Sequence, residues 1–167
     1  MKKMMMFLMV SVFFLMGGMT ESMAQKVESK VEPQVVLTPF SILAQPGETV
    51  RMTFTINGID LNDYYLIYVV VQKPGKGLEL LFIISTNGMI RYRNPAVSDR
   101  MTVSYDSSRR MGTITINWVQ PEDTGDYYVA IGNADYPMYW SQGTRLTVTT
   151  ASQYKTAPRK VSSSKQK

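Results

Sequence analysis

The chain has 167 residues, of which 44% are hydrophobic and 19% are charged, and its formal net charge is +5. This composition is typical of one folded domain with a hydrophobic core, and it excludes a fully disordered chain. Histidine and cysteine are both absent, which excludes Ser-His-Asp and Cys-His catalysis, zinc sites built from these residues, thiol redox chemistry and disulfide bonds. Carboxylates could still act as an acid–base pair, but their only dense cluster, Glu122, Asp123 and Asp126, lies in a turn signal. We therefore expect a protein that is not an enzyme and needs no cofactor.

The first segment has the pattern of a secretory signal peptide. Two lysines precede an apolar run over residues 4–16, which is shorter than a membrane-spanning helix. The small residues Ser22 and Ala24 predict cleavage after residue 24. We expect residues 1–24 to be removed, residues 25–34 to form a linker, and the chain to be secreted. A retained membrane anchor is the alternative.

From Val35 onward, apolar and polar residues alternate and turn residues recur about every ten positions, as in an all-β sandwich. This pattern predicts strands at residues 50–56, 65–72, 78–85, 101–105, 113–117, 127–131 and 145–149. Asn87-Gly88 predicts a two-residue hairpin turn between two of the strands. We predict an all-β fold of two antiparallel sheets over residues 35–150.

The positive charge is concentrated at the C-terminal end. Residues 151–167 contain five Lys or Arg and no Asp or Glu, whereas the segment 25–150 has a net charge of −1. A basic segment can contact polyanions or anionic membranes, but a solvated, disordered tail is the simpler interpretation. We expect no nucleic-acid partner and only an indirect association with membranes.

Three segments resemble antibody heavy-chain variable domains, in the same order and at similar separations. Residues 72–79 (QKPGKGLE) resemble the turn between the third and fourth strands of these domains. Residues 120–128 (QPEDTGDYY) resemble their E–F corner, and residues 140–148 (WSQGTRLTV) resemble a joining segment. The resemblance covers about residues 35–150, and it implies an immunoglobulin V-type Greek-key β-sandwich.

The chain departs from this family pattern in its core. The two core cysteines of the family fall on Phe54 and Val129, and the core tryptophan falls on Val69. Loss of a native disulfide costs about 2–5 kcal/mol. We expect Phe54 to offset this loss by packing against Val69 and Val129, in the space that the disulfide and the tryptophan would fill. Ser141 replaces the first glycine of the joining segment, which argues against the usual bulge in the last strand.

The resemblance implies structural roles for three residues near the E–F corner. Tyr127 falls at the position whose hydroxyl binds nearby backbone, and Asp123 is expected to pair with Arg100. The acidic cluster that contains Asp123 is therefore interpreted as structural and not as an acid–base pair. Trp118, in the same region, is a further contact candidate, although a packed turn residue is the simpler interpretation.

The resemblance also implies two binding surfaces. The first is the loop end, which would contact a ligand through residues of the kind that paratopes favour: Asn62, Tyr64, Asn87, Tyr92, Asp135, Tyr136 and Tyr139. The second is an apolar sheet face, which would pair with another V-type domain as a homodimer or heterodimer: Val70, Gln72, Leu78, Leu80, Tyr128 and Trp140. Ordinary turn residues, and cover by the domain's own loops, are the alternatives for these two sets.

The sequence therefore indicates a secreted binding domain of immune recognition. Two alternatives stay open. The chain could occupy the position of a light chain and assist receptor assembly, as a surrogate chain does, or it could be a soluble adhesion or decoy module. The identity of the ligand and of the partner is unknown at this stage.

Overall fold

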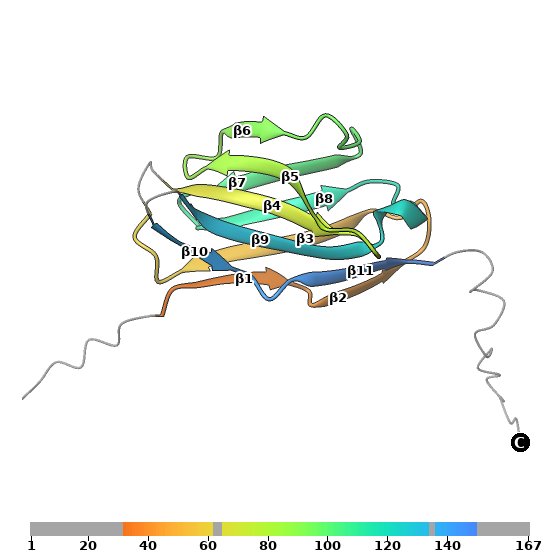
Figure 1. Ribbon diagram of the computed structural model, residues 1–167, viewed down its shortest axis with the longest axis horizontal. Helices are drawn as coiled ribbons and strands as arrows, with labels where there is room; N and C mark the ends of the chain where they lie inside the picture. The colour runs from red at the N-terminus through yellow and green to blue at the C-terminus, as the bar shows by residue number, and fades with distance from the viewer. Residues whose placement is uncertain (1–31, 62–64, 134–135, 150–167) are drawn as a thin grey trace, which may run out of the picture. The chain divides into compact units, whose positions relative to one another are not determined.

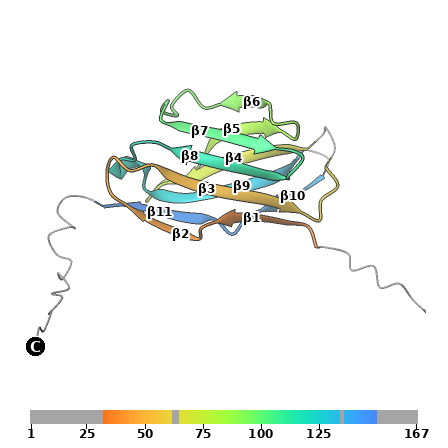
Figure 2. The ribbon, with the colours of Figure 1, turned by 180° about the vertical axis from the view of Figure 1, so that it is seen from behind.

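The computed structural model describes residues 32–61, 65–133 and 136–149, which form two β-sheets packed against each other (Figures 1 and 2). The predicted signal peptide and most of the linker lie outside these residues, as does the basic tail. Within the described ranges, no helix is long and apolar enough to cross a lipid bilayer.

One sheet has the strand order β1 (Gln34–Thr38), β3 (Val50–Asn57), β8 (Met111–Ile116) and β7 (Met101–Asp106). The other has the order β2 (Ser41–Ala44), β11 (Thr144–Val148), β9 (Gly125–Asn133), β4 (Leu66–Gln72), β5 (Leu78–Ser85) and β6 (Ile90–Arg93), with β10 (Tyr136–Trp140) paired to β9. The pairing of β2 with β11 is parallel, and the neighbouring β9 and β11 are antiparallel. A short 3-10 helix, η1 (Pro121–Asp123), precedes β9. The predicted all-β sandwich is thus confirmed.

The burial patterns of the strands follow the apolar and polar patterns of their sequences. In β3 every second residue is buried, so one face of the strand points into the core and the other carries arginine and threonine. The central strand β4 is more continuously apolar, because its outward face is also largely covered. Four short strands, β1, β2, β6 and β10, were not predicted, since four or five residues give too little alternation for a period to be recognised.

The core contains no disulfide bond, because the chain has no cysteine. Phe54, Val69 and Val129 are all fully buried in the same hydrophobic cluster. Phe54 also has close neighbours in its own sheet. Phe54 pairs across the ladder with Gly112, which pairs in turn with Tyr105. The rings of Phe54 and Tyr105 are stacked, with centroids 5.9 Å apart and an interplanar angle of 1°.

Gly112 makes this stacking possible. A Cβ atom at Gly112 would overlap Cζ of Phe54 and would lie 2.6 Å from the carbonyl oxygen of Ser104. The two rings therefore cover the glycine from both neighbouring strands, an arrangement that protects a glycine within a sheet. Burial also raises the pKa of the Tyr105 phenol. The Phe54 ring thus lies along its own sheet, stacked with Tyr105 and next to Gly112.

Two details of the turns differ from the sequence-based expectations. The β5–β6 hairpin has a three-residue loop, because the amide of Ser85 donates to the carbonyl of Met89 at 2.9 Å. Residues 86–88 form this loop, and Gly88 has a φ of 88°, which glycine adopts without strain.

The bulge in the last strand is present although Ser141 replaces glycine. Ala130 pairs with Trp140, and Tyr127 pairs with Thr144. The two residues on β9 are three positions apart, whereas their partners on β10 and β11 are four positions apart, so one extra residue lies between these two strands. The Ser141 hydroxyl accepts a hydrogen bond from the amide of Val129 at 3.0 Å. The left-handed backbone that the bulge needs is supplied by Gly143, whose φ is 87°. The expectation that serine would remove the bulge was therefore wrong.

Candidate functional site

The predicted pairing residues form a continuous surface on the outer face of the larger sheet. Leu80, Val70 and Tyr128 stand in register across β5, β4 and β9. One pair further along the same face, Gln72 lies opposite Leu78. The structure therefore brings these five residues together, from three adjacent strands.

Trp140 extends this surface onto β10. It pairs with Ala130, which is two residues from Tyr128 and therefore on the same face of β9. We refer to Val70, Gln72, Leu78, Leu80, Tyr128 and Trp140 as the sheet face.

The sheet face is apolar and largely open to solvent. The side chains of Leu78 and Trp140 are 58% and 47% exposed, and Leu80 and Tyr128 are half-buried. Val70 is only 7% exposed, so it forms the floor of the surface and not a protruding contact. An exposed set of large apolar side chains is typical of an interaction site.

An ion pair lies at the border of the sheet face. Asp126 stands opposite Gln72 across the β4–β9 ladder. Its Oδ1 accepts a hydrogen bond of 2.7 Å from Nε of Arg145, and this bond is the main cause of the lowered pKa of the Asp126 carboxyl. The six residues of the face itself carry no charge. Covering these six side chains with an apolar surface would therefore desolvate no charge that belongs to the face itself.

The joining-segment glycine positions Tyr128. A Cβ atom at Gly143 would lie within 2.5 Å of Cε1 of Tyr128. The tyrosine ring therefore packs directly over this glycine, and its orientation on the sheet face depends on the absence of a side chain there.

The loop-end candidates are placed only in part. Asn62, Tyr64 and Asp135 lie outside the described residues, as does the side chain of Tyr136. Asn87 lies in the β5–β6 turn, where its Oδ1 accepts hydrogen bonds from the Ser85 hydroxyl and the Met89 amide. Its amide oxygen therefore stabilises the turn.

The two remaining loop-end candidates lie on strands and not in loops. Tyr92 is on β6 and is exposed, whereas Tyr139 is on β10, half-buried and packed against the core. Sequence reasoning missed the exposed apolar residues beside them, which are Met89, Ile90 and Met138. The sequence could have indicated them, because Met89 and Ile90 directly follow the Asn-Gly turn and Met138 lies just before the joining segment.

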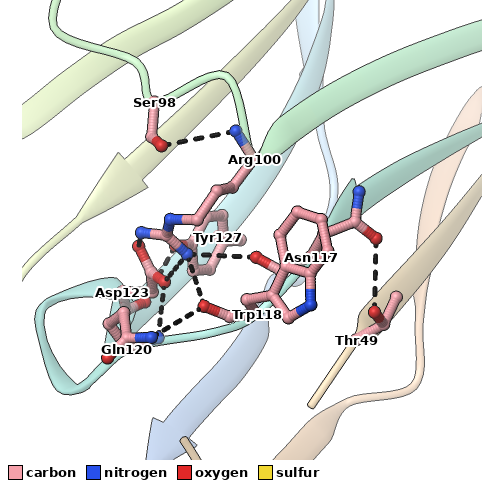
Figure 3. A network of polar contacts seen from close by, with 8 residues as sticks. All are labelled: Thr49, Ser98, Arg100, Asn117, Trp118, Gln120, Asp123 and Tyr127. Atoms are coloured by element: carbon pink, nitrogen blue, oxygen red, sulfur yellow. Dashed lines mark hydrogen bonds and ion pairs between the residues drawn. The ribbon is translucent and has the colours of Figure 1, made fainter. Parts of the chain in front are cut away.

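At the opposite end, the E–F corner is held by a network of polar contacts (Figure 3). The guanidinium of Arg100 binds both carboxylate oxygens of Asp123, with Nη1–Oδ2 at 2.8 Å and Nη2–Oδ1 at 3.3 Å. Asp123 Oδ2 also accepts from the amide of Gln120 at 2.8 Å. The hydrogen bond to Asp123 raises the pKa of Arg100. The pair is bidentate and mostly buried, which is the strong geometry for an ion pair.

Tyr127 completes the corner. Its hydroxyl donates to the carbonyl oxygen of Asp123 at 2.8 Å, and burial of the ring raises the pKa of the phenol. Of the two acidic residues on η1, Asp123 is thus engaged in structural bonds and Glu122 is exposed. In the described part of the chain, no three carboxylates gather into a group that could hold a metal ion.

Trp118 lies in the turn between β8 and η1, and its side chain is 64% exposed. Its φ is 47°, a left-handed conformation that costs about 1–2 kcal/mol for a residue with a side chain. The backbone is nevertheless fixed on both sides. Nη1 of Arg100 donates to the carbonyl oxygen of Trp118 at 2.9 Å, and the amide of Val119 donates to the carbonyl of Glu48 at 2.8 Å. The interpretation of Trp118 as a packed turn residue was wrong.

Comparison with known proteins places this geometry in a family. The immunoglobulin V-set domain model matches residues 37–149. An Ig heavy chain V region of Xenopus laevis is 35% identical over 107 residues, which cover 63% of this chain and 78% of the relative.

Two further relatives give the same picture. An Ig heavy chain V region of Mus musculus is 36% identical over 115 residues, covering 64% of this chain and 78% of the relative. An IgW heavy chain V region of Heterodontus francisci is 37% identical over 122 residues, covering 71% of this chain and 99% of the relative. With its two-sheet fold, its bidentate corner and its joining-segment bulge, the chain belongs to the immunoglobulin V-set family and is related to antibody heavy-chain variable regions.

Proposed function

We propose that this chain is a secreted binding domain of immune recognition, which pairs through the sheet face with another V-type domain and contacts a ligand with its loop end. The observation that supports pairing is the open, uncharged set of side chains on the sheet face. A soluble domain gains nothing from exposing Leu78 and Trp140 to water. A partner that covers them removes that cost.

A matched pair of variants tests the pairing. Leu78→Arg places a charge at the most exposed leucine of the sheet face, and Leu43→Arg makes the same change on strand β2, where the leucine is 74% exposed and outside the face. We expect Leu78→Arg to abolish pairing, because the arginine would be desolvated without a partner. Leu43→Arg should leave pairing intact, and both should leave the melting temperature nearly unchanged.

The readout covers both kinds of partner. Sedimentation velocity of the chain alone detects a homodimer, and capture from the secretory pathway of the source cells, followed by mass spectrometry, detects a heterodimer. If Leu78→Arg and Leu43→Arg capture the same V-type partner equally well, and neither changes self-association, the proposal is wrong.

The loop end is tested separately. Variation of residues 132–139 among transcripts of one animal would support a rearranged receptor that contacts its ligand with this segment. An invariant segment would count against loop-based recognition of diverse ligands, and it would favour the surrogate-chain alternative. The pairing test and this test can fail independently.

A further inference from the structure

The turn around Trp118 combines two features that cost stability and that the sheet-face function does not use. The indole is exposed, and the backbone carries a left-handed φ of 47°. The backbone of the turn is nevertheless hydrogen-bonded on both sides, to Arg100 and to the carbonyl of Glu48. A strained, hydrogen-bonded turn that presents a large aromatic side chain is characteristic of a contact site.

Two acidic residues, Glu48 and Glu122, lie close to this turn in the fold. Glu48 is tied to the residue after Trp118 through its backbone, since Val119 both donates to the carbonyl of Glu48 and accepts from the amide of Gly47, each at 2.8 Å. Glu122 is exposed on η1, four residues after Trp118. The Glu48 carboxylate accepts a hydrogen bond from the amide of Gln45 at 2.9 Å, and Glu122 adds to the hydrogen bond of Asp123 in raising the pKa of Arg100. Among the residues that the structure describes, no lysine or arginine forms an ion pair with either of these two carboxylates.

The chemistry of this surface fits a cationic side chain. An indole face attracts an ammonium or guanidinium group, and a nearby carboxylate adds to that attraction. We refer to Trp118, Glu48 and Glu122 as the base surface.

The chain supplies such cations next to the base surface. Residues 151–167 carry five Lys or Arg and no acidic residue. The last described residues enter this region from β11. The amide of Val148 donates to Oγ1 of Thr124, just after η1, at 3.0 Å. The amide of Thr149 donates to the carbonyl of Ala44 at 3.0 Å. The segment therefore starts between the two stretches that carry Glu122 and Glu48.

Length poses no obstacle. Ala44 is only three residues before Gly47, whose amide binds Val119. Three residues span at most about 10 Å at about 3.3 Å per residue, so five or six residues after Thr149 are long enough to cover the distance from Ala44 to Gly47. A tethered segment is also present at a high effective concentration, which is about millimolar for short flexible linkers.

We propose that residues 151–167 dock in cis on the base surface, with a Lys or Arg side chain over the indole of Trp118 and its charge facing Glu48 and Glu122. The basic segment is then a ligand of its own domain, and it shields the exposed tryptophan. This inference is independent of pairing through the sheet face, since none of the three base-surface residues belongs to that face.

The two tryptophans of the chain allow an internal control. In the full chain with ¹⁵N-labelled indoles, the Trp118 resonance, assigned with Trp118→Phe, reports on the base surface, and the Trp140 resonance reports on the sheet face. We expect replacement of Lys155, Arg159, Lys160, Lys165 and Lys167 by glutamine to shift the Trp118 resonance and leave that of Trp140 in place. High salt should reproduce this shift, because exposed charge pairs are screened. Glu48→Gln combined with Glu122→Gln should weaken the salt response.

Two outcomes would overturn the proposal. In the first, the Trp118 resonance is the same in the full chain and in the glutamine variant. In the second, the difference disappears on dilution, which would show that the segment binds a second copy instead of its own domain.

Discussion

Gly112→Ala is the most informative single change in this core. Gly112 lies on β8 between Phe54 on β3 and Tyr105 on β7, under two stacked rings. The added Cβ would overlap Cζ of Phe54, and it would stand 2.6 Å from the backbone oxygen of Ser104. The phenyl ring could rotate away only by giving up the stacking, and the carbonyl belongs to the β7 backbone next to Tyr105 in sequence.

The sign of the change in stability on Gly112→Ala distinguishes steric overlap in the core from the usual effect of this substitution on the unfolded chain. Replacing glycine by alanine at an unstrained site stabilises a protein by about 0.4–1 kcal/mol through the unfolded chain. Overpacking a core costs about 1–3 kcal/mol, and more when the backbone must move. We therefore expect Gly112→Ala to lower the free energy of unfolding by about 3 kcal/mol, which is comparable to the loss of a native disulfide.

The assay is equilibrium unfolding in urea, arranged as a double-mutant cycle with Phe54→Leu. Leucine removes the Cζ atom that the new methyl group would overlap, so the double variant should be more stable than the sum of the two single effects by at least about 1 kcal/mol. The backbone contact with Ser104 prevents full rescue. Gly77→Ala is the control, because nothing lies within 4 Å of a Cβ atom there. A Gly112→Ala variant as stable as the original chain, or strictly additive costs, would refute the stacked arrangement.

Three further predictions concern the polar contacts. Arg100→Leu leaves the mostly buried Asp123 carboxylate without its cation, and it should lower the free energy of unfolding by about 3 kcal/mol in urea titrations; an unchanged midpoint would contradict the bidentate pair. Tyr127→Phe should cost about 1 kcal/mol at neutral pH. Because burial raises the folded pKa of the Tyr127 phenol, the original chain should lose stability above about pH 10, where the unfolded tyrosine ionises, and the variant should lose less. Arg145 lowers the folded pKa of Asp126, so the stabilisation from this carboxylate is present above about pH 4 and is lost as the pH falls. The stability difference between the original chain and Asp126→Asn should therefore shrink in acid, and a difference that is independent of pH would exclude that role.

The strands that the sequence predicted best are those with a clear period. The alternation at Val50 to Ile56 and the continuous apolar run of β4 identify a half-exposed and a central strand, because each pattern follows from the number of faces that are buried. The E–F corner was anticipated from a resemblance, and the bond from the Tyr127 hydroxyl to the carbonyl of Asp123 has the geometry that the resemblance implies.

The features that sequence reasoning missed depend on backbone conformation or on contacts between distant residues. Nothing local in the sequence indicates that Trp118 adopts a left-handed φ, since that conformation is imposed by bonds to Arg100 and Glu48 from other segments. The Phe54–Tyr105 stack requires three strands to be in register over Gly112, which single-strand patterns do not reveal. The bulge survived the change to Ser141 because a hydroxyl can accept the amide hydrogen bond, while the conformational freedom resides in Gly143.

The central claim, that the sheet face is the pairing surface, is tested most directly by hydrogen exchange of the chain in complex with the partner captured from its source cells. We predict that binding slows amide exchange on β4, β5 and the Tyr128-to-Trp140 region. Amide exchange on β3 and β8, in the other sheet, should not change. Protection confined to β3 and β8, with β4 and β5 unaffected, would contradict the claim.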